Sequence, residues 1–271
     1  TGDMPLSTLA EVYQQVYADL DQAIALYTSS GLNRTGNYEM NKDVAYAVYA
    51  RAAITRQDYT KAKTMAANAR ANYPLMTNAM YKAGFYSPNQ EWIWSCWGSS
   101  EETLYFYSYF AYIAYNSSAS AVRTYPKCIS KELFEKIPST DIRKSLFLDP
   151  TGYTYNTSTG VASTALKTRA FQLFPNLYST ATVYAYMQFK IAAADLPGVG
   201  HLNNFRSAEM YLIGAEAEYF LNNPTGAQNL LIELNKTSGR DPSYTCTKTG
   251  QALLDEIKLY RAIELWGEGF D

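Results

Sequence analysis

The chain has 271 residues, of which 47% are hydrophobic, so it can bury a substantial core as one large domain or two small ones. Its formal net charge is −2, and its Lys and Arg residues form no run or stripe. Nucleic acid is therefore not an expected partner, because phosphate binding needs clustered positive charge. The longest apolar stretches are far shorter than the roughly 20 residues that a membrane-spanning helix needs.

Residues typical of metal or disulfide chemistry are few, whereas aromatic residues are abundant. The three cysteines are an odd number without metal-like spacing, and His201 is the only histidine, so we expect no disulfide framework, no metal and no cofactor. The chain has 25 Tyr and 4 Trp beside 11 Phe. Tyrosine combines an apolar ring with a hydroxyl group that needs a partner, so this excess favours half-hydrated binding surfaces over dry cores.

The first predicted element is an amphipathic helix that begins after Thr8. Thr8 and Glu11 form a capping-box pattern, and the helix is expected to end near Ser29-Ser30-Gly31. Its predicted buried side carries Leu9, Val12, Val16, Leu20, Ala23, Ile24 and Tyr27.

A helical hairpin is predicted over residues 41–72, with Asn41 as the N-cap of its first helix. Gln57-Asp58-Tyr59 makes the turn, and Pro74 ends the unit. Ala50 and Ala62 are twelve residues apart, a spacing that places two small side chains where the helices cross.

The middle of the chain, residues 75–204, has a different pattern. Residues 86–129 are rich in aromatics and predict a strand or two with long loops, in which Trp92 and Trp94 lie on the same face. Residues 126–148 predict a helix, with Asp141 and Arg143 holding the loop at its end. Residues 151–160 could form a small hairpin, residues 182–190 a strand, and residues 196–204 a loop.

A second hairpin, over residues 205–239, organises the C-terminal part. Asn222-Asn223-Pro224 separates its two helices, since proline disfavours helix in the residue before it but suits the first turn of a helix. Ala215 and Ala227 repeat the spacing of twelve, and a last amphipathic helix is expected over residues 251–267.

These patterns predict a mainly α fold in which degenerate tetratricopeptide-type hairpins form a scaffold under an irregular middle. Generic helical hairpins are the alternative. We expect one domain, residues 1–271, made of an N-terminal helical part (1–74), an irregular ligand-binding middle (75–204) and a C-terminal helical part (205–271).

Two carboxylate pairs, Glu209 with Glu216 and Glu264 with Glu268, invite comparison with glycosidases. Retaining enzymes hold two carboxyl groups roughly 5–5.5 Å apart across a cleft, and one has a raised pKa. Two acids on a helix flank provide no cleft. Arg206 and Arg261 lie three residues before Glu209 and Glu264, so ion pairing within the helix or to its neighbour explains these acids. No nucleophile elbow, phosphate loop or zinc-protease motif occurs. We therefore expect no catalysis.

Several segments in order resemble the SusD/RagB family of nutrient-binding outer-membrane lipoproteins. They are DMPLSTLAEVYQQVYADLDQAIAL, QDYTKA, NQEWIWS, STDIRK, FRSAEMYLIGAEA and YRAIELWGEG. The deciding motifs are Arg206-x-Ala208-Glu209 leading into Ala215-Glu216-Ala217, and Arg261-x-x-Glu264-Leu265-x-x-Glu268-Gly269. The resemblance covers nearly the whole chain.

The chain departs from the family pattern at several places. Lys236-Thr237-Ser238 stands where the family usually has arginines, and Tyr260 stands where a charged residue is common. Family members continue beyond Asp271 and have a longer N-terminal part with a signal peptide and a lipidated cysteine. The sequence is therefore expected to be a fragment.

The resemblance implies a protein that binds glycans at the cell surface without cleaving them. It implies a location at the outer membrane through an N-terminal lipid anchor outside this chain, and a SusC-like TonB-dependent transporter as partner. The resemblance marks Glu91 to Ser95 as a structural strand and so implies that Trp92 and Trp94 are core residues. Family members commonly place glycan contacts in the loop region that follows Trp94. Aromatic rings there could stack on sugar rings beside polar groups, and the candidate binding residues are Trp97, Tyr105, Tyr107, Tyr109, Tyr112, Tyr115 and Asn116.

Two alternatives remain open at this point. Some family members serve peptide uptake, so the ligand could be a peptide. A tetratricopeptide-type scaffold that binds a protein segment in its groove is the other alternative.

Overall fold

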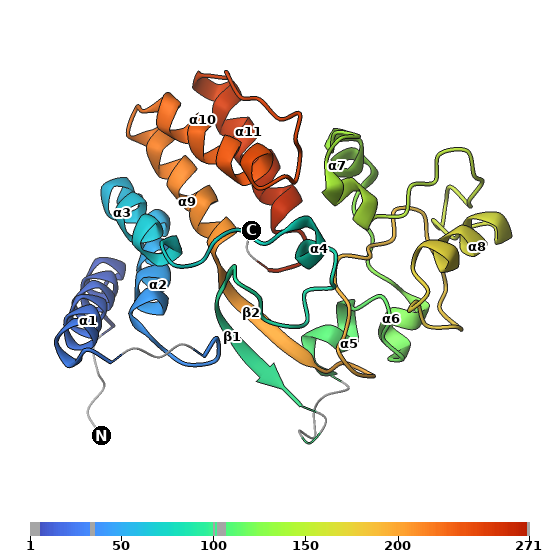
Figure 1. Cartoon of the computed structure of the whole chain (residues 1–271), viewed down its shortest axis with the longest axis horizontal. Coiled ribbons are helices and arrows are strands. Elements are labelled where there is room, and N and C mark those ends of the chain that lie inside the picture. The colour runs from blue at the N-terminus through green and yellow to red at the C-terminus, as the bar shows by residue number, and fades with distance from the viewer. Residues whose placement is uncertain (1–5, 33–35, 100, 102–106, 270–271) are drawn as a thin grey trace.

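The computed structural model describes residues 6–32, 36–99, 101 and 107–269. Helices dominate it, and the described strands form one two-stranded sheet. The predicted mainly α fold is confirmed. Figure 1 shows one layer of helices, from α1 at one end to α9, α10 and α11, and a second region of short elements around α5 to α8.

The N-terminal layer consists of α1 (Leu9–Ser30), α2 (Lys42–Thr55) and α3 (Tyr59–Arg70). The predicted caps of the first two helices are confirmed: Thr8 and Glu11 form the capping box, and the Asn41 side chain accepts a hydrogen bond from the Val44 backbone N–H. The helix α1 ends at Gly31, whose φ of 63° is a left-handed conformation that glycine adopts without steric cost.

The expectation of a buried side on α1 is wrong. No residue of α1 is buried, and Leu9, Val12 and Leu26 are largely exposed, because α1 packs on α2 and its far side is open. The stripe from Val16 to Tyr27 is half-buried against that one neighbour.

The C-terminal layer contains α9 (Ser207–Phe220), α10 (Pro224–Ile232), the π-helical turn η3 (Glu233–Thr237) and α11 (Gly250–Glu264). Pro224 occupies the first turn of α10, as the sequence predicts, and the structure adds Asn223 as the cap of this helix. The four alanines expected at the helix crossings, Ala50, Ala62, Ala215 and Ala227, are completely buried. Since α3 also packs against α9, the two hairpins form one continuous layer.

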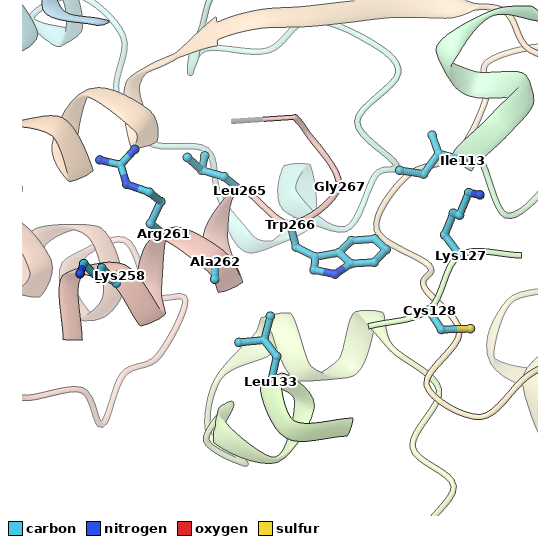
Figure 2. Close-up of a pocket in the computed structure, with 10 residues that line it drawn as sticks. All are labelled: Ile113, Lys127, Cys128, Leu133, Lys258, Arg261, Ala262, Leu265, Trp266 and Gly267. Atoms are coloured by element: carbon cyan, nitrogen blue, oxygen red, sulfur yellow. The ribbon is translucent and has the colours of Figure 1, made fainter. Parts of the chain in front are cut away.

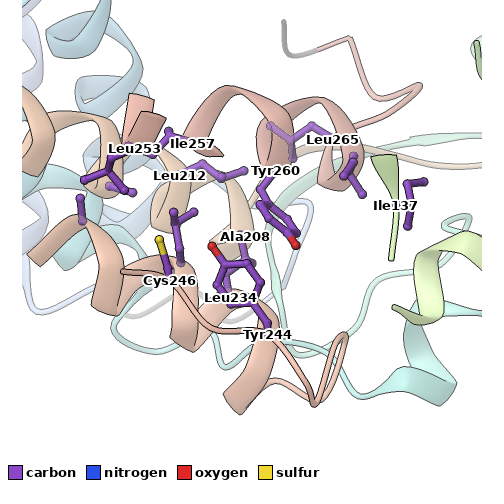
Figure 3. Packing of buried hydrophobic residues seen from close by; sticks show 14 of the residues in the cluster. Ile137, Ala208, Leu212, Leu234, Tyr244, Cys246, Leu253, Ile257, Tyr260 and Leu265 are labelled. Carbon is purple, nitrogen blue, oxygen red and sulfur yellow. The ribbon is translucent and has the colours of Figure 1, made fainter. Parts of the chain in front are cut away.

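A core of apolar side chains holds α9, α10 and α11 together. Figure 3 shows Leu212 of α9, Leu234 of η3 and Ile257 and Tyr260 of α11 among the buried side chains of this cluster. The segment after η3 adds Tyr244 and Cys246 to the same core. The helices of the C-terminal layer are therefore stabilised by a shared apolar core as well as by their own hydrogen bonds.

The sheet joins the middle of the chain to the C-terminal layer. Strand β1 (Trp92–Gly98) pairs antiparallel with β2 (Gly200–Arg206), with Trp97 opposite His201 and irregular register near Trp94. The prediction of a loop over residues 196–204 is wrong for its second half. Strand β2 forms because β1 supplies the hydrogen-bonding partner, which no local pattern reveals. The two predicted core tryptophans differ, since Trp92 is completely buried and Trp94 is only partly buried against Phe205.

The rest of the middle is made of short elements. They are α4 (Asn78–Tyr81), α5 (Tyr109–Ile113), α6 (Ser120–Thr124), α7 (Lys131–Lys136), the 3-10 helix η2 (Ile142–Leu146) and α8 (Thr164–Leu173). The helix predicted over residues 126–148 is reduced to α7 and η2, and residues 182–190 form isolated bridges instead of a strand. The hairpin suggested for residues 151–160 is a turn closed by one bridge, Tyr155 with Ala162.

Candidate functional site

Eight buried charged side chains meet where β1, η2, β2 and the end of α11 converge. Four are cations and four are anions: Arg143, Lys190, Arg206 and Arg240 with Glu91, Asp141, Glu264 and Glu268. Each of these side chains is at most 4% exposed. We call this set the ionic cluster. Its charges balance, as a group removed from water requires.

Arg206 lies at the centre of the ionic cluster. Its Nη1 donates to Glu91 and Glu264 at 2.6 Å each, and its Nε and Nη2 each donate to Glu268 at 2.7 Å. Arg143 pairs with Asp141, as the sequence predicts for that loop, and also reaches Glu264 at 2.7 Å. The ionic cluster thus ties residues of the middle of the chain to residues of its C-terminal part.

Glu264, at the end of α11, and Glu268, just after it, both have lowered pKa values. Burial alone would raise the pKa of Glu264, but the nearby charges of Arg240, Arg206 and Arg143 together outweigh burial. Burial is outweighed in the same way at Glu268, whose pKa is lowered by Arg206 and Lys190. Both carboxyl groups are therefore ionised and paired, whereas a general acid needs a raised pKa. In this geometry the ionic cluster is structural.

The remaining acids of the suspected pairs bind neighbouring helices. Glu209 accepts two hydrogen bonds from Arg51 of α2, at 2.7 and 2.8 Å, and Glu216 pairs with Arg261 of α11 at 2.9 Å. Arg206 binds within the ionic cluster and Arg261 binds Glu216, so the ion pairs suggested within one helix, Arg206 with Glu209 and Arg261 with Glu264, do not form. Ion pairing to a neighbouring helix, which was the other expectation, is observed for Glu209 and Glu216.

Three of the predicted binding residues present exposed rings. Trp97 is 49% exposed at the end of β1, and its ring lies 4.5 Å from that of its cross-strand neighbour His201. Tyr107 and Tyr112, at and just before α5, are 72% and 45% exposed. Burial lowers the pKa of His201, so its ring is neutral at pH 7.

Three other predicted residues make internal contacts. The Tyr109 hydroxyl donates to the Gly267 carbonyl at 2.7 Å, and burial raises its pKa. The Tyr115 ring packs edge-on against Phe189, with centroids 5.2 Å apart. The amide of Asn116 both donates to and accepts from the Ala193 backbone, at 2.9 and 2.7 Å.

Tyr105, the seventh candidate, lies outside the described residues. The rings available for stacking are therefore those of Trp97, Tyr107 and Tyr112. His201 is a neighbour of Trp97 that the sequence analysis did not include, because it lies 104 positions along the chain and only strand pairing brings it close.

A groove of about 610 Å³ lies between α11, α7 and residues 127–128. Figure 2 shows the Trp266 ring in its centre. The lining residues are Ile113, Lys127, Cys128, Leu133, Lys258, Arg261, Ala262, Leu265, Trp266 and Gly267. The recurrence of Lys258, Arg261, Ala262 and Leu265 at helical spacing is the signal in the sequence that points to this face.

Neither a metal centre nor a membrane span is found in the described ranges. Within them, no three His, Cys, Asp or Glu side chains are grouped so that they could hold a metal ion. No helix there combines the length and apolar character needed to cross a membrane.

Comparison with known proteins gives one family and a consistent set of folds. A family model described as the SusD family matches residues 47–271. A SusD-like carbohydrate-binding protein from Bacteroides vulgatus shares 28% identity over 98% of this chain and 51% of its own, with a TM-score of 0.74. A SusD superfamily protein from Bacteroides thetaiotaomicron, at 22% identity, has a TM-score of 0.69 over 97% of this chain and 54% of its own.

The chain thus spans about half the length of the solved structures it resembles. No curated protein matches it.

Proposed function

The chain belongs to the SusD family, and from that premise we propose that it binds an oligosaccharide without cleaving it. The observation that carries this proposal is the exposure of three aromatic rings, those of Trp97 in β1, Tyr107 before α5 and Tyr112 within α5. The solved relative described as carbohydrate-binding supports the ligand class.

The chemistry of these residues suits sugar rings. A pyranose presents C–H groups that stack on an aromatic face, while its hydroxyl groups need polar partners. Trp97 offers the largest face, and the neutral imidazole of His201 beside it can both donate and accept a hydrogen bond. By analogy with base stacking, each ring contributes roughly 1–3 kcal/mol. Two or three rings, less the cost of association, correspond to micromolar to millimolar affinity, which suits capture and release.

The same proposal places the protein in nutrient uptake. Family membership supports a lipid-anchored position on the outer membrane and transfer of the glycan to a SusC-like TonB-dependent transporter. The paired and ionised state of Glu264 and Glu268 supports binding without hydrolysis.

Calorimetric titration of a panel of oligosaccharides tests the ligand and the site together. We expect Trp97→Ala and Tyr107→Ala to weaken binding at least about fivefold each, because each removes a stacking ring. Tyr153→Ala is the matched control, since Tyr153 is another exposed tyrosine but lies on the loop beside α8. If sugars still bind after both substitutions, the binding site is not at these rings. If peptides bind and no sugar does, the ligand is a peptide and not an oligosaccharide.

A further inference from the structure

The groove between α11 and α7 has an apolar wall and cationic ends. Figure 2 shows the Trp266 ring in the middle, with Lys258 and Arg261 on one side and Lys127 on the other. The remaining wall is made of aliphatic side chains, including Leu133 of α7. Among the residues that the structure describes, no carboxylate side chain lines the groove.

The groove is open because of one small residue. Ala262 is exposed at the centre of the α11 face, one turn from Lys258 and close to Leu265. A methyl group there leaves room that a larger side chain would fill. The Trp266 ring forms the adjoining wall and is held from behind by Phe147, edge to face with centroids 5.1 Å apart.

Of the three cationic side chains that line the groove, one is paired with a carboxylate and two are not. Arg261 is engaged by Glu216 at 2.9 Å. Lys127 and Lys258 are exposed, and within the described part of the chain neither side chain has an ion pair or a hydrogen bond. Two ammonium groups therefore stand beside an apolar wall with no anion to balance them, which attracts a negatively charged ligand.

We propose that this groove binds an amphipathic small molecule whose apolar body lies on Trp266 and whose single anionic head group pairs with Lys127 or Lys258. A volume of about 610 Å³ is within the usual range for small-molecule sites. A sugar fits this groove less well, because none of the described lining residues has a carboxylate, amide or hydroxyl side chain to accept hydrogen bonds from sugar hydroxyl groups. The groove is thus a second site with a different ligand class from the exposed rings at Trp97.

Three amphiphiles with the same tail test the head-group preference. Decanoate, decyltrimethylammonium and a neutral decyl polyoxyethylene ether are titrated into the purified protein by calorimetry, each below its micelle concentration. We expect the affinity for decanoate to be at least about fivefold higher than for the other two amphiphiles, because one exposed ion pair contributes an effect of about this size. Lys127→Glu or Lys258→Glu should remove that advantage and leave the neutral ether unchanged. Equal binding of all three amphiphiles would overturn the proposal.

A filling variant locates the binding. Ala262→Phe places a ring in the groove and should weaken decanoate at least about tenfold, a loss typical of a blocked apolar site. Ala252→Phe, at an exposed position of the same helix that does not line the groove, is the control and should bind as the native protein does. Circular dichroism checks that both variants keep their helices. Decanoate binding that is unaffected by Ala262→Phe would refute this location, and oligosaccharide affinity should be the same in all variants.

Discussion

At the scale of single residues, the protein depends on charges that are buried and mutually neutralised. Glu264 accepts from Arg143 and Arg206 and lies 3.2 Å from Arg240. Glu264→Gln would leave these buried guanidinium groups short of one negative charge, so we expect the free energy of unfolding to fall by about 3–5 kcal/mol. Urea denaturation followed by circular dichroism measures it.

A surface pair provides the control for that substitution. Glu135 lies 3.6 Å from Lys131 on α7, with both side chains about 60% exposed. Because water screens such a pair, Glu135→Gln should change the free energy of unfolding by less than about 0.5 kcal/mol. Equal effects of the two Glu→Gln substitutions would contradict the role given to the ionic cluster.

At the scale of elements, close packing of helix backbones defines the hairpins. Ala62 of α3 is completely buried against α2, whereas Ala67 of the same helix is exposed. Ala62→Leu should lower the free energy of unfolding by about 1–3 kcal/mol through overpacking. Ala67→Leu should have almost no effect, since alanine and leucine have similar helix propensities. Thermal unfolding of the two variants compares them, and a similar melting temperature for both would show that the crossing tolerates a larger side chain.

At the scale of the whole molecule, the ionic cluster makes the free energy of unfolding depend on pH. The folded pKa values of Glu264 and Glu268 lie below the ordinary value of 4.5, so the unfolded chain binds more protons as the pH falls through that value. The stability these groups contribute is therefore present above about pH 4.5 and is lost progressively as the pH falls below it. We expect the free energy of unfolding to decrease between about pH 6 and pH 3.5, in urea titrations at several pH values.

Because the ionic cluster includes residues of η2, β2 and α11 and Glu91 just before β1, the loss of structure in acid should be cooperative. Helix content and tryptophan fluorescence should change together as the pH falls. Glu268→Gln should give a less stable protein whose stability depends less steeply on pH, since one titrating group is removed. Separate transitions for the two signals, or an unchanged slope in this variant, would contradict the coupling.

The sequence by itself determined the helical layer. The capping residues Thr8 and Asn41 and the alanines at the crossings act through neighbours a few positions away, so their patterns are readable locally. The same is true of the pair Asp141 with Arg143, and of the aromatic character of the segment that contains Trp97.

Only the tertiary structure decided which of these residues face outward and which charges meet. Strand β2 needed β1 as a partner, and Arg206 found Glu91 and Glu268 instead of Glu209 three residues away. Tyr109 and Tyr112 have the same residue type on one short helix, yet Tyr109 bonds to Gly267 and Tyr112 is exposed. The physical reason is that hydrogen-bond and charge partners far apart in the chain are selected by the way the elements pack, and this selection leaves no periodic trace in the sequence.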